Sequence, residues 1–130
     1  MAEARPEPAL SEEDARAFRQ GVAQFNAGFF FECHDTLEDV WGGVRGPSRD
    51  FFQGLIQVAV AFHHLTGGNA AGAESMLGRA LKRFEGYPDR YFGFDLGRHR
   101  QELQDWLGRI RSDATAPPSL DELPKWRFEL

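Results

Sequence analysis

One stretch of this sequence would be apolar around almost its whole circumference if it folded as a helix. Ser48 is a candidate N-cap for it, and the stretch ends near Thr66, directly before Gly67 and Gly68. Its apolar residues are Phe51, Phe52, Leu55, Ile56, Val58, Ala59, Val60, Ala61, Phe62 and Leu65. A helix that is apolar on all sides is stable in water only when other parts of the chain surround it. We therefore expect this helix to stand at the centre of the fold.

Four further segments repeat apolar residues at helical spacing, and glycine, proline or polar residues separate them. They cover residues 11–27, 29–41, 69–84 and 95–111. A short break such as the one at Gly28 favours a helix that folds back antiparallel on the helix before it. The sequence therefore predicts an all-α fold of five helices arranged in antiparallel hairpins.

The length and composition of the chain suit one domain with flanking irregular segments. A chain of 130 residues with 42% hydrophobic residues and twelve phenylalanines can build a single core. Residues 1–10 hold two prolines and little to bury, which predicts a flexible N-terminal arm. Residues 11–130 are predicted to form the domain. Within it, 114–130 loses helical spacing, and apolar residues alternate from Trp126 to Leu130, so we expect an irregular tail that docks on the helices.

A weak internal repeat relates the two predicted hairpins. The turn glycines Gly28 and Gly68 are 40 residues apart, and the same offset aligns Leu37 with Leu77. Two antiparallel helix pairs with small residues at matched positions are typical of tetratricopeptide-type repeats. Any two hairpins of similar length would also give several matches, so the sequence leaves both interpretations open.

The predicted helix at 29–41 carries two ionisable residues on its apolar side. A turn of about 100° per residue brings His34, Glu38 and Trp41 onto one face, among phenylalanines and leucine. Asp35 and Asp39 fall on the opposite arc. The pattern predicts that these two aspartates are solvated, that Glu38 points with His34 into the protein, and that Trp41 anchors the core. Because burial of an unpaired charge is costly, the pair requires a partner.

The stretch from His34 to Trp41, HDTLEDVW, fits the HxxxExxW signature of the bacterial and archaeal domain-of-unknown-function family 309. The sequence from Gln24 to Leu81 also resembles this family. The resemblance implies a small all-helical domain without an assigned activity, for which metal binding through the signature has been suggested. That suggestion applies here to His34 and Glu38 alone. Asp35 departs from the glutamate expected after the histidine, and a solvated position makes the change of little consequence.

The central helix offers polar counterparts to this pair. Gln53, Gln57 and His64 lie on one narrow stripe of that helix, among the few polar side chains in its interior. If the two helices form an antiparallel hairpin centred near Gly46, Gln53 faces Glu38 and Gln57 faces His34. The stripe is therefore either the one wet strip of the central helix or the partner of the His34 and Glu38 pair.

Three interpretations of these residues remain open. The first is a buried, fully hydrogen-bonded network with a structural role. The second is a divalent transition metal held by His34 and Glu38, with His64 or His63 as a further ligand, although His64 falls about a helix end away. The third is acid or base catalysis by Glu38 with His34. Cys33 lies about 100° round the helix from His34, which predicts an inert buried thiol.

Composition excludes several classes of function. A net charge of −5 without a basic cluster argues against nucleic-acid partners, since phosphate backbones bind concentrated positive charge. The longest apolar run is far shorter than the roughly 20 residues that span a membrane. The N-terminus lacks the pattern of a signal peptide, and one cysteine offers no disulfide framework, so we predict a cytoplasmic protein.

The sequence thus leads to two hypotheses of function. The first is a small helical domain that binds a ligand or metal through the His34 and Glu38 site, supported by Trp41, Gln53, Gln57 and His64. The second is a protein-interaction module of helical-repeat type, which would bind a protein partner or a second copy of itself. Whether the protein is an enzyme stays open. Of the remaining histidines, His99 is interpreted as an ordinary helix residue.

Overall fold

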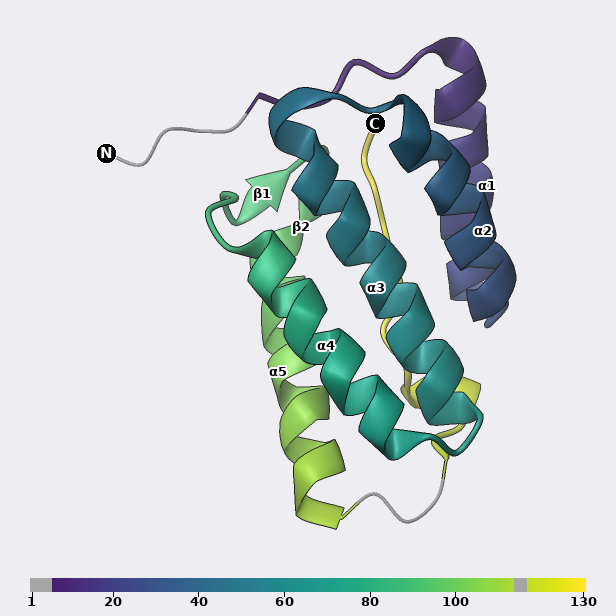
Figure 1. The fold of residues 1–130 in the computed structure, drawn as a ribbon, viewed down its shortest axis with the longest axis vertical. Coiled ribbons are helices and arrows are strands. Elements are labelled where there is room, and N and C mark those ends of the chain that lie inside the picture. The colour runs from purple at the N-terminus through teal and green to yellow at the C-terminus, as the bar shows by residue number, and fades with distance from the viewer. Residues whose placement is uncertain (1–5, 114–116) are drawn as a thin grey trace.

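The computed structural model describes residues 6–113 and 117–130, and in them five helices account for most of the ordered structure (Figure 1). The helices are α1 (Glu12–Asn26), α2 (Phe30–Gly43), α3 (Arg49–Thr66), α4 (Ala70–Phe84) and α5 (Leu96–Asp113). Two short strands, β1 (Arg90–Tyr91) and β2 (Phe94–Asp95), pair antiparallel before α5, and single 3-10 turns cover Gly46–Ser48 and Leu120–Glu122. The prediction of an all-α fold with five helices is confirmed.

Each helix packs against the next one in the chain, so the fold is a succession of hairpins. α1 packs on α2, α2 on α3, α3 on α4 and α4 on α5. Figure 1 shows α2, α3 and α4 side by side in front, with α1 behind α2 and α5 behind α4. The C-terminal segment runs behind α3, between α1 and α5, where no helix lies. The core is therefore centred on α3, whose side chains are mostly buried.

The two successive hairpins, α1 with α2 and α3 with α4, turn in the same way. Gly28 and Gly68 both have a positive φ, at 87° and 86°, which glycine adopts at little cost. Leu37 and Leu77, which the 40-residue offset aligns, are both fully buried. These matches support the internal repeat. Its assignment to the tetratricopeptide type stays a prediction.

Capping side chains fix where two of the helices begin. The Ser11 hydroxyl accepts a hydrogen bond from the Asp14 amide at 3.0 Å and caps α1. The Asn69 side chain accepts one from the Gly72 amide at 2.9 Å and caps α4. Each satisfies a backbone donor that the first helical turn leaves without a partner. The helix boundaries therefore follow from short polar signals in the sequence.

The C-terminal segment is held on the helices by its aromatic residues. Trp126 is 2% exposed and stacks on Phe25 with ring centroids 3.7 Å apart. The Asn26 side chain bonds both the amide and the carbonyl of Trp126, at 2.7 and 2.8 Å. Phe128 stacks on Phe94 at 4.3 Å. This segment closes the side of the core that faces away from α2 and α4.

Parts of the predicted arm and tail lie outside the described residues, namely 1–5 and 114–116. The described end of the arm is bonded to the domain: the Tyr91 hydroxyl donates to the Pro6 carbonyl at 2.6 Å, and the Glu7 carboxylate accepts from the Phe92 amide at 2.9 Å. The first contact reaches the end of β1 and the second the loop that follows it, so this end of the arm lies against the two-stranded hairpin.

Substitutions at Gly54 of α3 and Gly78 of α4 would measure how tightly these two helices pack. A Cβ atom at Gly54 would lie 2.5 Å from the ring of the fully buried Phe84, whereas one at Gly78 would meet nothing within 4 Å. We predict that Gly54→Ala lowers the free energy of unfolding by about 1 to 3 kcal/mol through overpacking. Gly78→Ala is the matched control and should raise it by about 0.5 to 1 kcal/mol. Urea denaturation measures both, and an unaffected Gly54→Ala would contradict the close packing.

Candidate functional site

His34 and Glu38 contact each other one helical turn apart on α2. His34 Nε2 lies 2.7 Å from a carboxylate oxygen of Glu38. The Glu38 side chain is 54% exposed and that of His34 is 22% exposed. The prediction that Glu38 is buried is wrong, and with it the expectation of a buried His34 and Glu38 site. Asp35 and Asp39 are exposed, as predicted.

The position of the buried stripe on α2 explains the error. The fully buried residues Cys33, Leu37 and Val40 form the centre of the face that packs into the core. Measured from Leu37, His34 lies about 60° and Glu38 about 100° round the helix. His34 is therefore at the edge of the packed face, and Glu38 is beyond it, on the exposed side of α2. The Glu38 carboxylate stays in contact with water at this position and therefore avoids the cost of burying a charge.

Trp41 lies at the C-terminal end of α2 and is half-buried rather than a buried core anchor. The guanidinium of Arg49 stacks over its ring at 4.0 Å from the centroid. The same guanidinium donates to the Val44 carbonyl at 2.7 Å and to the Trp41 carbonyl at 3.3 Å. Carbonyls at a helix end lack intrahelical partners, so Arg49 both satisfies them and covers the indole.

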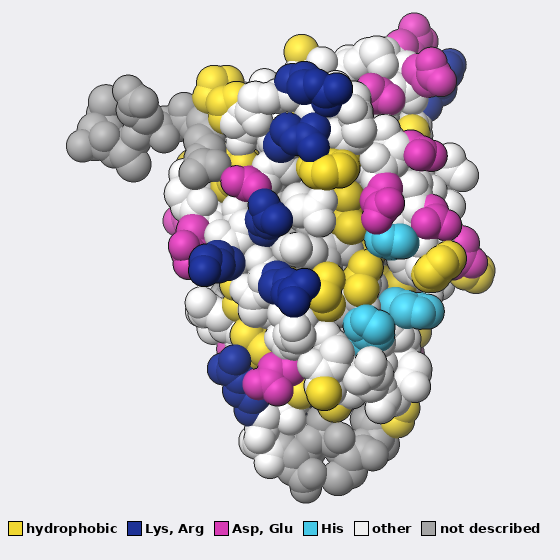
Figure 2. Space-filling view, in the orientation of Figure 1, with side chains coloured by type: hydrophobic (Ala, Val, Ile, Leu, Met, Phe, Trp, Pro, Cys, Tyr) yellow, Lys and Arg dark blue, Asp and Glu magenta, His cyan; other side chains and the backbone are white. Residues whose placement is uncertain are grey.

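The register of α2 against α3 brings the predicted polar residues to one face. Trp41 contacts Arg49 at one end of the pair, and the ring of Phe31 lies 5.6 Å from that of His63 at the other. The antiparallel helices therefore place His34 and Glu38 at the heights of Gln57 and Gln53. Histidines lie between the acidic side chains over α2 and the basic ones over α4 and the start of α3 (Figure 2).

Three polar atoms on this face are buried and have no hydrogen-bond partner among the described residues. They are Trp41 Nε1, the Gln57 side-chain oxygen and His34 Nδ1. Asp35 comes within 3.4 Å of His34 Nδ1 but without hydrogen-bond geometry. A fully satisfied structural network is therefore not what these residues form. Buried polar groups without partners are uncommon in folded proteins, and each calls for an explanation.

The histidines predicted as further metal ligands lie apart from the His34 and Glu38 contact. His64 is next to the turn into α4, where its Nδ1 is 3.4 Å from the side-chain nitrogen of Asn69. His63 neighbours His34 only through Phe31, whose ring lies 5.6 Å from each imidazole. Across residues 6–113 and 117–130, no three His, Cys, Asp or Glu side chains are placed to hold one ion. His34 and Glu38 thus offer two potential ligands, and neither His63 nor His64 adds a third.

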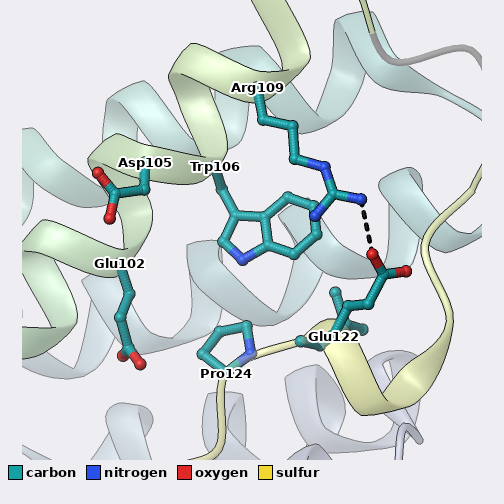
Figure 3. A pocket seen from close by; sticks show the side chains of 7 residues that line it. Glu102, Asp105, Trp106, Arg109, Glu122 and Pro124 are labelled. Atoms are coloured by element: carbon teal, nitrogen blue, oxygen red, sulfur yellow. Dashed lines mark hydrogen bonds and ion pairs between the residues drawn. The ribbon is translucent and has the colours of Figure 1, made fainter.

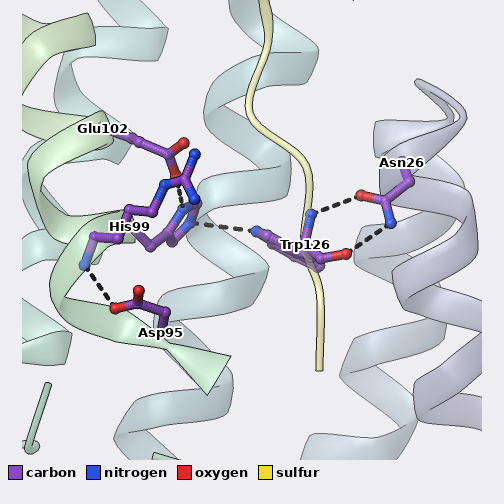
Figure 4. A network of polar contacts seen from close by, with 6 residues as sticks. Asn26, Asp95, His99, Glu102 and Trp126 are labelled. Atoms are coloured by element: carbon purple, nitrogen blue, oxygen red, sulfur yellow. Dashed lines mark hydrogen bonds and ion pairs between the residues drawn. The ribbon is translucent and has the colours of Figure 1, made fainter. Parts of the chain in front are cut away.

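A second polar cluster, centred on His99 of α5, is buried behind this layer, and the sequence did not indicate it (Figure 4). The Trp126 indole N–H donates to His99 Nε2 at 3.2 Å, and Glu102 lies 3.2 Å from Nδ1. An indole can only donate, so Nε2 is unprotonated and the ring proton is on Nδ1, facing Glu102. Burial lowers the pKa of the His99 imidazole, and the nearby Glu102 carboxylate offsets part of that effect.

A groove between α5 and the C-terminal segment lies beside this cluster (Figure 3). One cavity of about 310 Å³ is bounded by Trp106 and Pro124, with Glu102 on one side and the ion pair of Arg109 and Glu122 on the other. Glu102 and Pro124 also line a neighbouring cavity of about 600 Å³. Trp126, the second partner of His99, is 27 residues away in an irregular segment, so helical spacing gave no signal for their contact.

The single cysteine takes no part in either site. Cys33 is fully buried in the core, and burial raises the pKa of its thiol to about 12. A thiol with so high a pKa is not ionised near neutral pH and is a poor nucleophile or metal ligand. The prediction that this thiol is buried is confirmed, and its raised pKa supports an inert role.

Fold and site together define a small all-α domain of helical hairpins with a half-exposed polar site on one face. Within it, residues 18–76 match the model of the family described as Domain of unknown function (DUF309). This segment runs from α1 into α4 and contains His34, Glu38 and Trp41. The resemblance drawn from the HxxxExxW signature is confirmed, and the segment is a DUF309 domain.

Two relatives are similar to most of the chain. An uncharacterised protein of Aquifex aeolicus (strain VF5) is 30% identical over 108 residues, which are 82% of this chain and 32% of that protein. The uncharacterised protein YpuF of Bacillus subtilis (strain 168) is 32% identical over 101 residues, or 75% of this chain and 58% of that protein. The chain thus spans about a third and somewhat over half of the length of these relatives.

Among the residues that the structure describes, none of the helices combines the length and the apolar character needed to pass through a membrane.

The His99 cluster predicts a pH dependence of stability. Because the pKa of His99 in the folded chain lies below its ordinary value of 6.5, the unfolded chain takes up a proton more readily. The stabilisation is therefore complete above about pH 6.5 and is lost as pH falls through the lowered pKa. Protonation would also place a proton on Nε2, against the Trp126 N–H. Denaturation midpoints between pH 4.5 and 8, roughly the range in which histidines titrate, measure this loss.

The His99→Gln variant isolates the contribution of His99, because the other three histidines are present in both proteins. We expect the midpoint of His99→Gln to fall less steeply toward acid than that of the wild type. Equal slopes for the two proteins would show that His99 does not contribute.

Proposed function

We propose that the DUF309 domain of this chain binds a small polar ligand on the face formed by α2 and α3. The observation that carries the proposal is the pair of buried, unpaired atoms on Trp41 and Gln57. Burial of an unpaired donor or acceptor costs about 1 to 3 kcal/mol, which is a large share of the stability of a small domain. A ligand with both a donor and an acceptor would remove that cost.

The surroundings of these atoms also support binding. Gln57 is 6% exposed and lies in the middle of the outward stripe of α3, between Gln53 and the half-buried Val60. Arg49 fixes the indole of Trp41 from one side, so its donor is held in place before a ligand arrives. Preorganised polar groups in a mostly apolar setting are typical of small-molecule sites.

Replacement of Gln57 distinguishes a ligand site from a structural residue. If the Gln57 amide awaits a ligand, Gln57→Leu should leave the free protein as stable as the wild type, or about 1 kcal/mol more stable, because an unsatisfied polar group is removed. Thermal and urea denaturation measure this, with the exposed Gln20→Leu on α1 as control. A structural role would instead make Gln57→Leu clearly less stable than the control.

The same variant serves in a thermal-shift screen of small polar metabolites. Compounds that bind at this face should raise the melting temperature of the wild type but not that of Gln57→Leu. A compound that stabilises both proteins equally binds elsewhere. A screen in which no compound discriminates between them would count against the proposal.

A divalent transition metal on His34 and Glu38 is a second candidate function. The supporting observation is the separation of 2.7 Å between the imidazole Nε2 and the carboxylate of a solvent-accessible pair at positions i and i+4. Such pairs on one helix face can bind one ion. Closed metal sites have about four protein ligands, so water or a bound ligand would complete the coordination here.

Elemental analysis tests the metal candidate directly. Protein purified without chelator should carry close to one equivalent of zinc, manganese or iron, and the His34→Ala variant should lose it. Metal that binds only the folded chain also stabilises it, so chelator should lower the melting temperature of the wild type alone. A wild type that contains no metal and takes up none of these added ions would exclude the candidate, while the Gln57→Leu result would be unaffected.

A further inference from the structure

A cavity of about 500 Å³ opens between α3 and the second half of α4, and most of its wall is basic. Arg79, Lys82 and Arg83 of α4 line it together with Asp50 and Gln57 of α3. Arg83 donates to Asp50 at 2.7 Å and is held in place by it. Within the described part of the chain, Arg79 and Lys82 have no ion-pair partner. The cavity therefore has a net positive charge.

Gln57 supplies a polar group at the buried side of this cavity. It is 6% exposed, and no described residue forms a hydrogen bond with its side-chain oxygen. Whichever end of the amide points inward, one polar atom stays unpaired there. The cavity thus contains two cationic side chains without an ion-pair partner among the described residues and a buried amide with an unpaired polar atom. A single ligand could bind both.

Helix electrostatics explain only part of the positive charge. Lys82 and Arg83 lie in the last turn of α4, where cations stabilise the negative helix end. Arg79 lies a turn earlier and is three and four residues from the other two. Like charges at these spacings repel each other. The clustering therefore needs a further reason, and the unpaired Gln57 amide is independent of it.

We infer that this cavity binds the phosphate group of a small phosphorylated molecule. Arg79 and Lys82 would contact the phosphate oxygens, and a hydroxyl or amine of the same molecule would donate to Gln57. Arginine and lysine together suit a dianion with three terminal oxygens. The volume is in the range of small-molecule sites and exceeds what a lone phosphate fills. The inference rests on the proposed function, because Gln57 belongs to both.

The test is a titration of the isotope-labelled full chain, followed by nuclear magnetic resonance of its amides. Inorganic phosphate and glycerol 3-phosphate are added at constant ionic strength, with succinate as a dianion of different geometry. The Arg79→Ala, Lys82→Ala double variant removes the two unpaired cations. Its matched control is Arg16→Ala, Arg19→Ala, which removes the same charge from exposed positions on α1.

We expect saturable shifts in α3 and α4, including the side-chain amide of Gln57, and tighter binding of glycerol 3-phosphate than of phosphate. Loss of Arg79 and Lys82 should weaken binding at least about tenfold, since contacts to charged groups are worth that much. The control should change affinity less than about twofold, an effect of net charge alone. Gln57→Leu should abolish the preference for glycerol 3-phosphate over phosphate.

Three results would overturn the inference: equal weakening in the two double variants, equal affinity for succinate and phosphate, or shifts spread over the whole surface.

If phosphate fails to bind while neutral metabolites distinguish the wild type from Gln57→Leu, the proposed function stands and the phosphate inference falls. If phosphate binding needs Arg79 and Lys82 but Gln57→Leu proves destabilising, the proposed function falls and the anion cavity stands. Circular dichroism of every variant confirms that it is folded.

Discussion

The structure depends on covering α3, because almost all of that helix must be kept from water. α2 and α4 cover its two flanks, and the C-terminal segment closes the side behind it. Trp126 joins this segment to α1 and to α5. Its ring stacks on Phe25 of α1, its backbone bonds Asn26 of the same helix, and its indole bonds His99 of α5. One aromatic residue in an irregular segment therefore takes the place that a further helix would have.

The same arrangement leaves one stripe of α3 without cover, and the polar residues of the helix gather there. Gln53 and His64 are partly solvated, so water compensates for their polar atoms. Gln57 differs, because it is only 6% exposed while its side-chain oxygen has no hydrogen-bond partner among the described residues. A leucine at this position would fit the composition of the rest of the helix. The amide at the most buried point of the stripe is the feature on which the proposed binding surface depends.

Periodicity predicted the helices and their order because each hairpin is local: apolar spacing, caps and turn glycines lie within a few residues of the structure they specify. The helix wheel failed for Glu38, since it ranked faces by their apolar content and could not tell which face meets a neighbour. The packed stripe runs through Cys33, Leu37 and Val40, and Glu38 lies beside it. The contact between His99 and Trp126 could not be predicted for a different reason, because Trp126 belongs to a segment without periodicity.

The boundaries of the DUF309 match divide the site into two parts. Residues 18–76 include the His34 and Glu38 contact, Trp41 and the Gln57 amide, but end before Arg79 and the basic turn of α4. The unpaired polar atoms are thus a property of the matched segment, whereas the positive charge beside them comes from the part of the chain that follows it. A ligand that spans both would be oriented by the first and selected for its charge by the second. For the proposed ligand, such a division would let the neighbouring sequence alter the preference without any change in α2, which carries the signature.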